Sequence, residues 1–433
     1  MDDALEKKAC RISIKLRVSS ILACFRMPGT LGKRLFSEPK WLALWAAMLG
    51  FLLDAMDVLL YVFAIQVLRT EFGLSNQQAG LVSSATLLAS AIGGVVSGAL
   101  SDKYGRRTML MATILLYSFA SAGTAFSNSL ASLMFWRALV GLGLGGEWSA
   151  GATLVAEYWP AEHRGKAISF MQSGWALGYM AAAGLTALIL PRFGWRMLFL
   201  VGVLPALFTL WIRAKVQEPP VWTARKEQGR LSDIFRGEIG RRTLLATAIA
   251  TSTLFAYWGL FTWLPGFLSA SKENGGAGLS ILRTTGWVFL MQAGAFFGYL
   301  SFGFFADRLG RRPAFLLYVA MAALLMPLYG LAPSWNLDHL VLWLGPLVGF
   351  FGTGYFALFG VMLAELYPTA VRGSGQGFTY NVGRGISALA PFLVGAIADR
   401  SGIGYGIALT SAFFVVAASL IFLLPETRHV EIT

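Results

Sequence analysis

Long apolar stretches alternate with short polar ones along almost the whole chain. A helix needs about 20 mostly apolar residues to cross the ~30 Å hydrocarbon core of a bilayer, and most of the stretches approach or exceed that length. The pattern predicts twelve membrane-spanning helices, at residues 41–68, 81–100, 109–126, 130–155, 167–190, 197–212, 243–268, 285–304, 313–332, 340–363, 377–398 and 403–424.

The twelve segments fall into two sets of six around a polar stretch. We therefore predict an all-α integral membrane fold, in which two six-helix bundles enclose a polar cavity. The predicted parts are a basic cytoplasmic N-terminal arm (1–40), an N-terminal bundle (41–213), a cytoplasmic linker (214–242), a C-terminal bundle (243–425) and a cytoplasmic tail (426–433). Within the linker, Leu231, Ile234, Phe235 and Ile239 recur at helical spacing among basic residues, which predicts an amphipathic helix on the membrane surface.

Two polar motifs occur once in each set of helices. GALSDKYGRR at 98–107 returns as GFFADRLGRR at 303–312, and AEYWPAEHRGKAISF at 156–170 returns as AELYPTAVRGSGQGF at 364–378. Each half also closes on a Glu-Pro or Pro-Glu element, QEPP from Gln217 and LPET from Leu424. The parallel duplication of a multi-helix unit is the internal symmetry of many secondary transporters.

Composition and charge agree with a membrane protein. The 433 residues are 56% hydrophobic and only 13% charged, whereas soluble domains carry roughly a quarter of charged residues. The net charge of +13 could suggest nucleic-acid binding, but most of the 35 Lys and Arg residues fall in the arm and in the loops on one side of the helices. By the positive-inside rule this places both termini in the cytoplasm of a multi-pass cell-membrane protein, and we expect no nucleic-acid partner.

Charged residues interrupt the apolar segments of the first half. Asp54 and Asp57 lie on one face of the first helix, and Arg137 in the fourth helix lies at a similar depth, with Glu147 nearer the cytoplasm. Each such charge costs about 2.5–3.5 kcal/mol even on the lenient insertion scale, and buried unpaired carboxylates take up protons. We predict that these four residues form a proton-coupling set and that Asp54 or Asp57 carries the proton, although a helix cap, an inter-helix contact or a structural Arg137 would also fit.

The second half contains one arginine in the middle of an apolar segment. Arg384 has no acid in its own half, and with Asn381 it is the best candidate to hold a carboxylate, since a guanidinium fork suits that group. Gln172, Trp175 and Tyr355 are further candidates for substrate binding, although helix contact would equally explain Gln172 and Trp175.

The repeated motifs predict a gate on the cytoplasmic side. We expect Asp102 to face the N-terminal end of the helix at 377–398, where the helix dipole favours an anion, and Asp307 to face the helix at 167–190 in the same way. The candidate ion pairs are Glu157 with Arg106 or Arg164, and Glu365 with Arg311 or Arg372. Static surface bridges are the alternative interpretation.

These motifs resemble the major facilitator superfamily over residues 41–428. G-x-x-x-D-[RK]-x-G-R-[RK] and E-x-x-P-x-x-x-R-G each occur twice at repeat spacing. LLDAMD, GLGLGGEWSAGATLVAEYWP and QSGWALG resemble the sialate:H+ symporter family of organic-acid and monocarboxylate permeases. LLDAMD is also similar to the D-G-[FY]-D element of aromatic-acid:H+ symporters, with Ala55 in place of the glycine and Met56 in place of the aromatic residue.

The resemblance implies a proton-coupled symporter that takes up a small organic acid by alternating access. A proton antiporter that exports a metabolite or drug, and a sugar or sugar-acid symporter, are the alternatives; GWALGYMAAAG lacks the Gly-Pro pair of drug exporters, which favours import. The three histidines lie outside the apolar segments and the chain has no nucleotide or metal motif, so we expect no enzyme, no metal and no cofactor. The expected partners are the solute, protons and the lipid bilayer, around a monomer.

Overall fold

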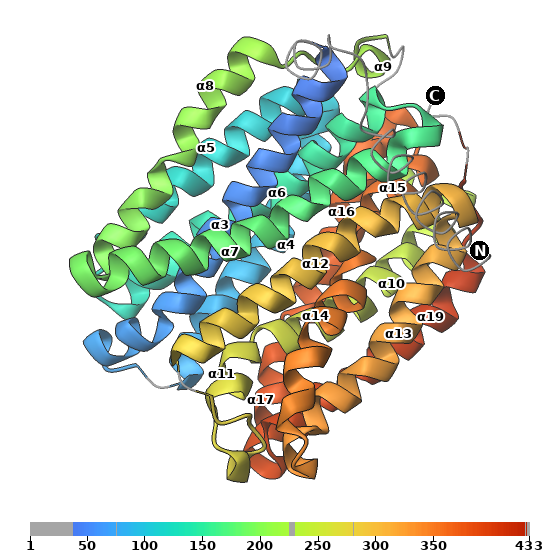
Figure 1. The fold of residues 1–433 in the computed structure, drawn as a ribbon. Helices are drawn as coiled ribbons and strands as arrows, with labels where there is room; N and C mark the ends of the chain where they lie inside the picture. The colour runs from blue at the N-terminus through green and yellow to red at the C-terminus, as the bar shows by residue number, and fades with distance from the viewer. Residues whose placement is uncertain (1–37, 75, 225–229, 280, 429, 431–433) are drawn as a thin grey trace, which may run out of the picture.

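The computed structural model describes residues 38–433 except 75, 225–229, 280, 429 and 431–433, so the predicted arm lies almost wholly outside the described residues (Figure 1). The first half contains α3 (Pro39–Phe72), α4 (Asn76–Tyr104), α5 (Arg106–Thr124), α6 (Leu130–Tyr158), α7 (Ala161–Leu200) and α8 (Pro205–Lys215). The second half contains α10 (Gly237–Phe261), α11 (Leu264–Ser269), α12 (Ile281–Leu309), α13 (Arg311–Leu331), α14 (Asp338–Gly354), α15 (Ala357–Leu366), α16 (Arg372–Ser387), α17 (Ala390–Ser401), α18 (Ile403–Leu409) and α19 (Ser411–Leu420).

The elements make twelve passes, which confirms the predicted fold class. Nine helical stretches of the described chain are long and apolar enough to cross a membrane, and one of them, Ala161–Ile212, makes two passes because α7 kinks at Gly194 (φ 75°). The short α5 and the polar α6 complete the set. Four later passes are bent pairs, namely α10–α11, α14–α15, α16–α17 and α18–α19.

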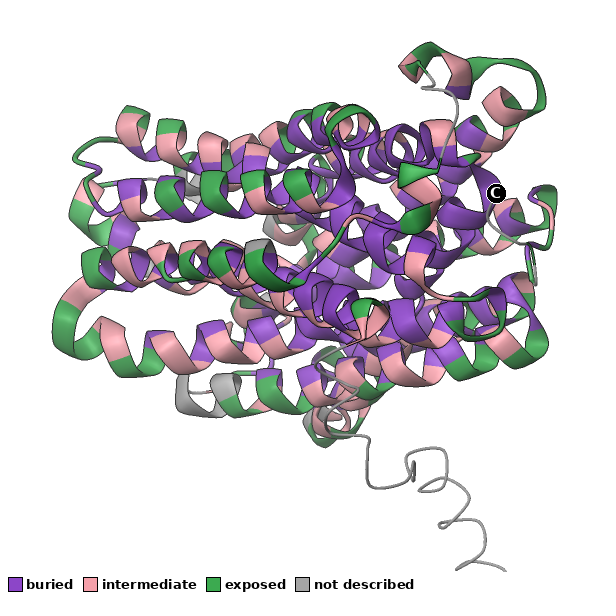
Figure 2. Ribbon diagram, turned by 90° about the horizontal axis from the view of Figure 1, so that it is seen from above, coloured by how far each residue is buried: buried purple, intermediate pink, exposed green. Residues whose placement is uncertain are grey.

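The outer surface of the molecule is apolar. Large side chains point outward along the helices, including Phe119, Leu207, Leu244 and Trp343, each at least 60% exposed. Buried residues gather along the middle of the molecule, and the outer helix faces are exposed (Figure 2). An apolar surface of this extent suits a protein surrounded by lipid.

The two GRR motifs form matching turns at one end of the molecule. Gly105 (φ 104°) and Gly310 (φ 109°) precede α5 and α13, and the carboxylates of Glu218 and Glu426 accept hydrogen bonds from the first N–H groups of these two helices at 2.8–3.3 Å. A Cβ at Gly105 would lie 2.2 Å from Glu218, so the turn requires glycine. The repeated Glu-Pro and Pro-Glu elements therefore supply helix caps. We call this end of the molecule, with the α6–α7 and α15–α16 turns, the motif face.

The predicted amphipathic helix of the linker does not form as one element. Leu231–Phe235 makes a single 3-10 turn (η2), and Gly237 (φ 51°) breaks the register before α10 begins. Ile234 is fully buried, and Phe235 packs edge-on against Phe378 at 4.9 Å. A 3-10 turn and the start of α10 thus stand in place of one helix across 231–239, with Ile234 buried in the protein and Phe235 still 53% exposed. The boundaries of the two bundles themselves stay a prediction.

The halves meet along two helix pairs, α4 with α16 and α7 with α12. Glycines let the backbones approach: a Cβ at Gly98 would lie 2.5 Å from the carbonyl oxygen of Gly373, and one at Gly303 would lie 2.8 Å from that of Gly165. Because these crossings bring the two halves into direct backbone contact, the side chains beside them can form bonds from one half to the other.

Candidate transport site and gate

A small central cavity of about 10 Å3 lies between the halves. It is lined by Phe51, Gln172, Trp175, Leu254, Tyr257, Trp258, Tyr299, Phe356, Tyr380 and Arg384. Seven of these ten residues are aromatic, and the single charged group among them is Arg384. The cavity therefore offers flat apolar walls and one cation.

Aromatic side chains join the two halves at and beside this cavity. The indole N–H of Trp175 donates to the hydroxyl of Tyr257 at 2.7 Å. Trp148 stacks on Tyr380 with ring centroids 3.9 Å apart, and its indole N–H donates to Gln172 at 3.0 Å. Opening the cavity would require these contacts between helices of different halves to separate.

Arg384 projects from α16 of the second half toward acids of the first half. Its guanidinium lies 5.0 Å above the ring of Tyr380 and is 5% exposed. Its positive charge acts on both Asp54 and Glu147. Among the described residues, none supplies a hydrogen-bond partner to its Nε atom. A buried cation with spare donors can hold an anion.

Asp54 and Glu147 form the acidic side of this arrangement. Both are fully or almost fully buried, and within the described chain Asp54 Oδ1 and both carboxylate oxygens of Glu147 lack hydrogen-bond partners. Glu147 fits against the backbone of α3 because residue 50 is glycine, where a Cβ would lie 2.5 Å from its Oε1. Burying a carboxylate without a partner disfavours its charged form.

Asp57 has a different environment from Asp54, although both lie on α3. It accepts a hydrogen bond from Ser121, and its Oδ2 lies 3.8 Å from Arg137 Nη1. Arg137 in turn lies 5.3 Å from the ring of Tyr61 and 6.0 Å from that of Phe199. This pair is enclosed within the first half, whereas Asp54 Oδ1 has no hydrogen-bond partner among the described residues.

Two predicted substrate residues do not reach the cavity. Asn381 donates to the carbonyl of Gly377 at 3.0 Å and to Ser149 at 3.2 Å, so it joins the halves as a packing contact. Tyr355 donates to the carbonyl of Thr253 at 3.3 Å inside the second half. The bend between α14 and α15 turns Tyr355 into its own bundle, and Asn381 lies against α4 and α6. Neither residue lines the cavity in this structure, and their part in substrate binding stays a prediction.

Gln172, Trp175 and Arg384 do line the cavity, but the sequence analysis missed most of its aromatic wall. Tyr380 could have been found, because it lies one helical turn before Arg384 and therefore on the same face. Phe51, Tyr299 and Phe356 gave no comparable signal, since aromatic residues occur throughout the apolar segments.

The two gate aspartates differ in how firmly they are held. Asp102 accepts hydrogen bonds from the backbone N–H of Gly373 at 3.0 Å and from the N–H and hydroxyl of Ser374 at 2.7 and 2.6 Å, at the start of α16. Asp307 accepts one from the N–H of Lys166 near the start of α7, at 3.2 Å. Both lie where the helix dipole favours an anion.

Glu157 joins the halves through two arginines. It binds Arg106 of its own half at 2.9 Å and Arg372 of the second half at 2.8 Å. The alternative partner Arg164, which the sequence left open, lies elsewhere. The reason is geometric: each junction arginine crosses to the opposite half, because the α6–α7 and α15–α16 turns face one another.

Glu365 repeats the arrangement in the second half. It binds Arg311 at 2.8 Å and Arg164 of the first half at 3.0 Å. The other predicted partner, Arg372, binds Glu157 of the first half instead. The chain after α19 adds to this site: the hydroxyl of Thr427 donates to Glu365 at 2.7 Å, and Arg164 donates to the carbonyl of Val430 at 3.1 Å. The motif face is thus closed by ion pairs between the halves.

Comparisons with known proteins agree with this architecture. The family model described as Major Facilitator Superfamily matches residues 47–300 and 276–433. The chain is 35% identical to a probable 4-methylmuconolactone transporter of Cupriavidus pinatubonensis, over 90% of this chain and 91% of that one. It is 31% identical to the niacin transporter NiaP of Acinetobacter baylyi, over 81% and 85%. The solved structure of the proton:xylose symporter XylE bound to 6-bromo-6-deoxy-D-glucose matches with a TM-score of 0.76 at 20% identity, covering 90% and 97%, which shows likeness of fold.

Proposed function

The chain belongs to the major facilitator superfamily and is a multi-pass membrane transporter, not an enzyme; from this premise we propose that it takes up a small, flat organic acid together with a proton. The observation that carries the proposal is the position of Arg384 in an aromatic cavity, near the buried acids Asp54 and Glu147 of the first half. Among the described residues, Asp54 Oδ1 and both carboxylate oxygens of Glu147 lack hydrogen-bond partners.

The chemistry of the cavity supports the substrate class. The guanidinium of Arg384 would hold the carboxylate of the solute, because its fork of N–H donors matches a carboxylate. A flat solute ring that packs on Trp175, Tyr257 or Tyr380 would gain about 0.5–1.5 kcal/mol for each aromatic pair, in addition to the free energy of burying its apolar surface. The relatives named for 4-methylmuconolactone and niacin support the same class. A flat unsaturated acid is therefore favoured over sialate, lactate or a sugar acid.

Proton coupling follows from competition for a single cation. When the solute carboxylate occupies Arg384, Asp54 and Glu147 lose the positive charge that stabilises their ionised forms. We assign the transported proton to one of them, Asp54, which is then a buried carboxylate without a compensating charge. Solute and proton therefore favour each other's binding, which is the linkage that a symporter needs. The loaded cavity carries less net charge, which allows the halves to rock past one another.

The ion pairs of the motif face would form the gate that closes in this state. Glu157 and Glu365 each bind one arginine from each half. Rocking would therefore break the two ion pairs that cross between the halves, Glu157 with Arg372 and Glu365 with Arg164. We keep the prediction that this face is cytoplasmic, from the distribution of Lys and Arg.

Uptake into proteoliposomes tests the proposal. With the outside acidified, the purified protein should accumulate radiolabelled nicotinate or benzoate, and a protonophore should abolish accumulation. Unlabelled flat acids should compete better than lactate, sialate or xylose. Accumulation without a proton gradient, transport only in the export direction, or competition by xylose alone would each refute the proposal.

A further inference from the structure

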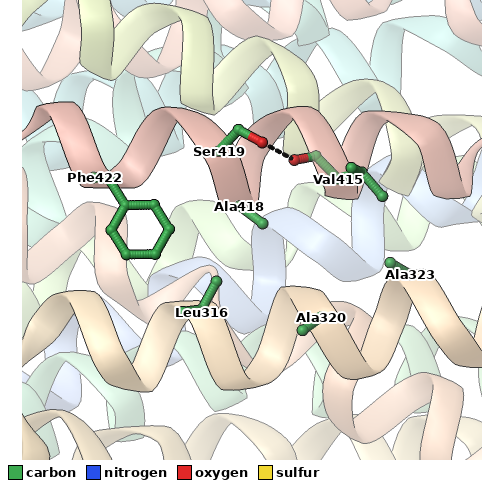
Figure 3. Close-up of a pocket in the computed structure, with 7 residues that line it drawn as sticks. All are labelled: Leu316, Ala320, Ala323, Val415, Ala418, Ser419 and Phe422. Atoms are coloured by element: carbon green, nitrogen blue, oxygen red, sulfur yellow. Dashed lines mark hydrogen bonds between the residues drawn. The ribbon is translucent and has the colours of Figure 1, made fainter.

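A groove on the lipid-facing side of the second half is unrelated to the central cavity. It has a volume of about 550 Å3 and lies between α13 and α19 (Figure 3). Its walls are Leu316, Ala320, Ala323, Val415, Ala418, Ser419 and Phe422. The hydroxyl of Ser419 donates to the carbonyl of Val415 at 3.0 Å, so the polar group is satisfied internally and the groove surface is apolar.

The groove exists because small residues face each other across two helices. In α13, Ala320 and Ala323 lie at helical spacing from Leu316, and Ala418 and Ser419 of α19 lie opposite. At two of these places the duplicated first half carries larger side chains: counting from the motif arginines, Ala320 corresponds to Leu115, and counting from the capping glutamates, Ala418 corresponds to Leu210.

Ser419 corresponds in the same way to Trp211, which stacks on Phe208 with ring centroids 5.2 Å apart and packs on the core of the first half. The two halves share one fold, so a wide channel at this place is not a requirement of the fold.

A cation closes the groove at the motif face. Arg312 lies one turn before Leu316 on the same side of α13, its guanidinium lies 5.7 Å from the ring of Phe422, and it donates to the carbonyl of that residue at 3.1 Å. The neighbouring carboxylate of Glu426 is already engaged by the N–H groups of Arg311 and Arg312, at 2.8 and 3.0 Å. Arg312 keeps further N–H donors toward the membrane surface.

The length of the groove matches one leaflet. Eleven residues separate Arg312 from Ala323, which is about 16 Å at 1.5 Å per residue, or roughly half of the ~30 Å hydrocarbon core. A chain that starts at the surface beside Arg312 and follows the groove would therefore end near the middle of the bilayer.

We propose that this groove holds one acyl chain of an anionic phospholipid of the leaflet at the motif face, with the lipid phosphate bound at Arg312. The apolar walls and the single-leaflet length suit the chain, and the cation at the mouth suits the phosphate. Basic pockets between transmembrane helices are suited to anionic headgroups, and a basic residue near the surface contributes about 1 kcal/mol.

Native mass spectrometry tests the proposal on the whole protein, purified in detergent and given equal amounts of phosphatidylglycerol and phosphatidylcholine with the same acyl chains. The wild type should retain one phosphatidylglycerol molecule in preference. A variant with both Ala320→Leu and Ala418→Leu, which copies the residues of the first half, should lose this adduct. Ala412→Leu adds the same bulk to an exposed position of α19 outside the groove and should keep it.

Arg312→Gln tests the contribution of the lipid headgroup separately from that of the acyl chain, because it removes the cation and leaves the groove walls unchanged. It should reduce the preference for phosphatidylglycerol about fivefold, the equivalent of the ~1 kcal/mol per basic residue, whereas Arg312→Lys should retain it. Gel filtration of each variant checks its folding. An unchanged adduct in the filled variant, equal retention of both lipids by the wild type, or a dimer that disappears when the groove is filled would overturn the proposal.

Discussion

The two halves of the molecule share one fold and the same motif turns, but they carry different interiors. The first half buries the charged residues Asp54, Asp57, Glu147 and Arg137 between its helices. Among the described residues of the second half, Arg384 is the one buried charged residue in the corresponding region. Where the motifs repeat, the bonds repeat as well, down to the glutamates that cap α5 and α13.

On the proposed function, the difference separates two roles: the repeated motif turns would form the gate, and the dissimilar interiors would bind the solute and the proton. A gate between two halves needs matching ion pairs on both of them, because the rocking motion separates the pairs on each side. A binding site needs opposite charges that face each other, and two identical interiors would place like charges across the cavity. We expect the first half to handle protons and the second half to handle the anion.

The largest expected effect comes from removing the cation of the second half. Arg384→Ala should weaken solute binding by about 10- to 150-fold, the equivalent of the 1.5–3 kcal/mol of a hydrogen bond to a charged group. Arg384→Lys should retain part of it, because an ammonium keeps the charge and loses the planar fork. The measurement is the Kd of nicotinate or benzoate by thermal shift and by transport competition. An unchanged affinity of Arg384→Ala for the solute would refute the assignment of anion binding to the second half.

The two aspartates of α3 should behave differently from one another. Asp54→Asn should abolish accumulation driven by a proton gradient and leave solute exchange in place, because Asp54 lies within reach of the charge of Arg384 and we assign it the transported proton. Asp57→Asn should instead lower the thermal stability, since removing one partner of a buried pair costs about 3–5 kcal/mol and leaves Arg137 uncompensated. The matched measurements are pH-driven uptake, counterflow and the unfolding temperature of each variant. Uncoupling by Asp57→Asn with normal stability would reverse the two roles.

The gate should be tighter at Asp102 than at Asp307. Asp102→Asn disturbs three hydrogen bonds to the start of α16, whereas Asp307→Asn disturbs one to α7, and each bond to a charged acceptor contributes about 1.5–3 kcal/mol. Hydrogen–deuterium exchange at residues 372–378 should therefore rise by about tenfold or more in the first variant, and exchange at 161–167 should rise less in the second. Equal increases would show that the repeated motifs act as equals.

The smallest expected effect concerns an ion pair outside the spans. Arg196 binds Glu71 at 2.6 Å, and a hydrogen bond from Trp195, followed by the charge of Arg196, lowers the pKa of Glu71 below its ordinary value of 4.5. A lowered folded-state pKa stabilises the protein above the ordinary value and loses that contribution as the pH falls through the lowered one. Because both side chains are well exposed, the pair contributes at most about 1 kcal/mol.

Arg196→Gln should therefore lower the unfolding temperature only slightly at pH 7, and the difference from the wild type should shrink at strongly acidic pH. Thermal unfolding in detergent across that pH range measures it. A difference that grows as the pH falls would contradict the assigned direction of the Glu71 pKa.

The sequence by itself determined the twelve helices, the duplication and the identity of the buried charges. Each of these depends on local pattern: the length of an apolar run, the spacing of a motif, or a charge within such a run. The partners of the gate aspartates could also be predicted, because a helix N-terminus attracts an anion wherever it lies.

Only the tertiary structure decided which charges meet. It paired Asp57 with Arg137, exchanged Arg164 and Arg372 between the halves, and removed Asn381 and Tyr355 from the cavity wall. These outcomes depend on the rotation of each helix about its axis and on bends such as that between α14 and α15. Helix rotation is set by packing against other helices, so no single segment of the sequence encodes it.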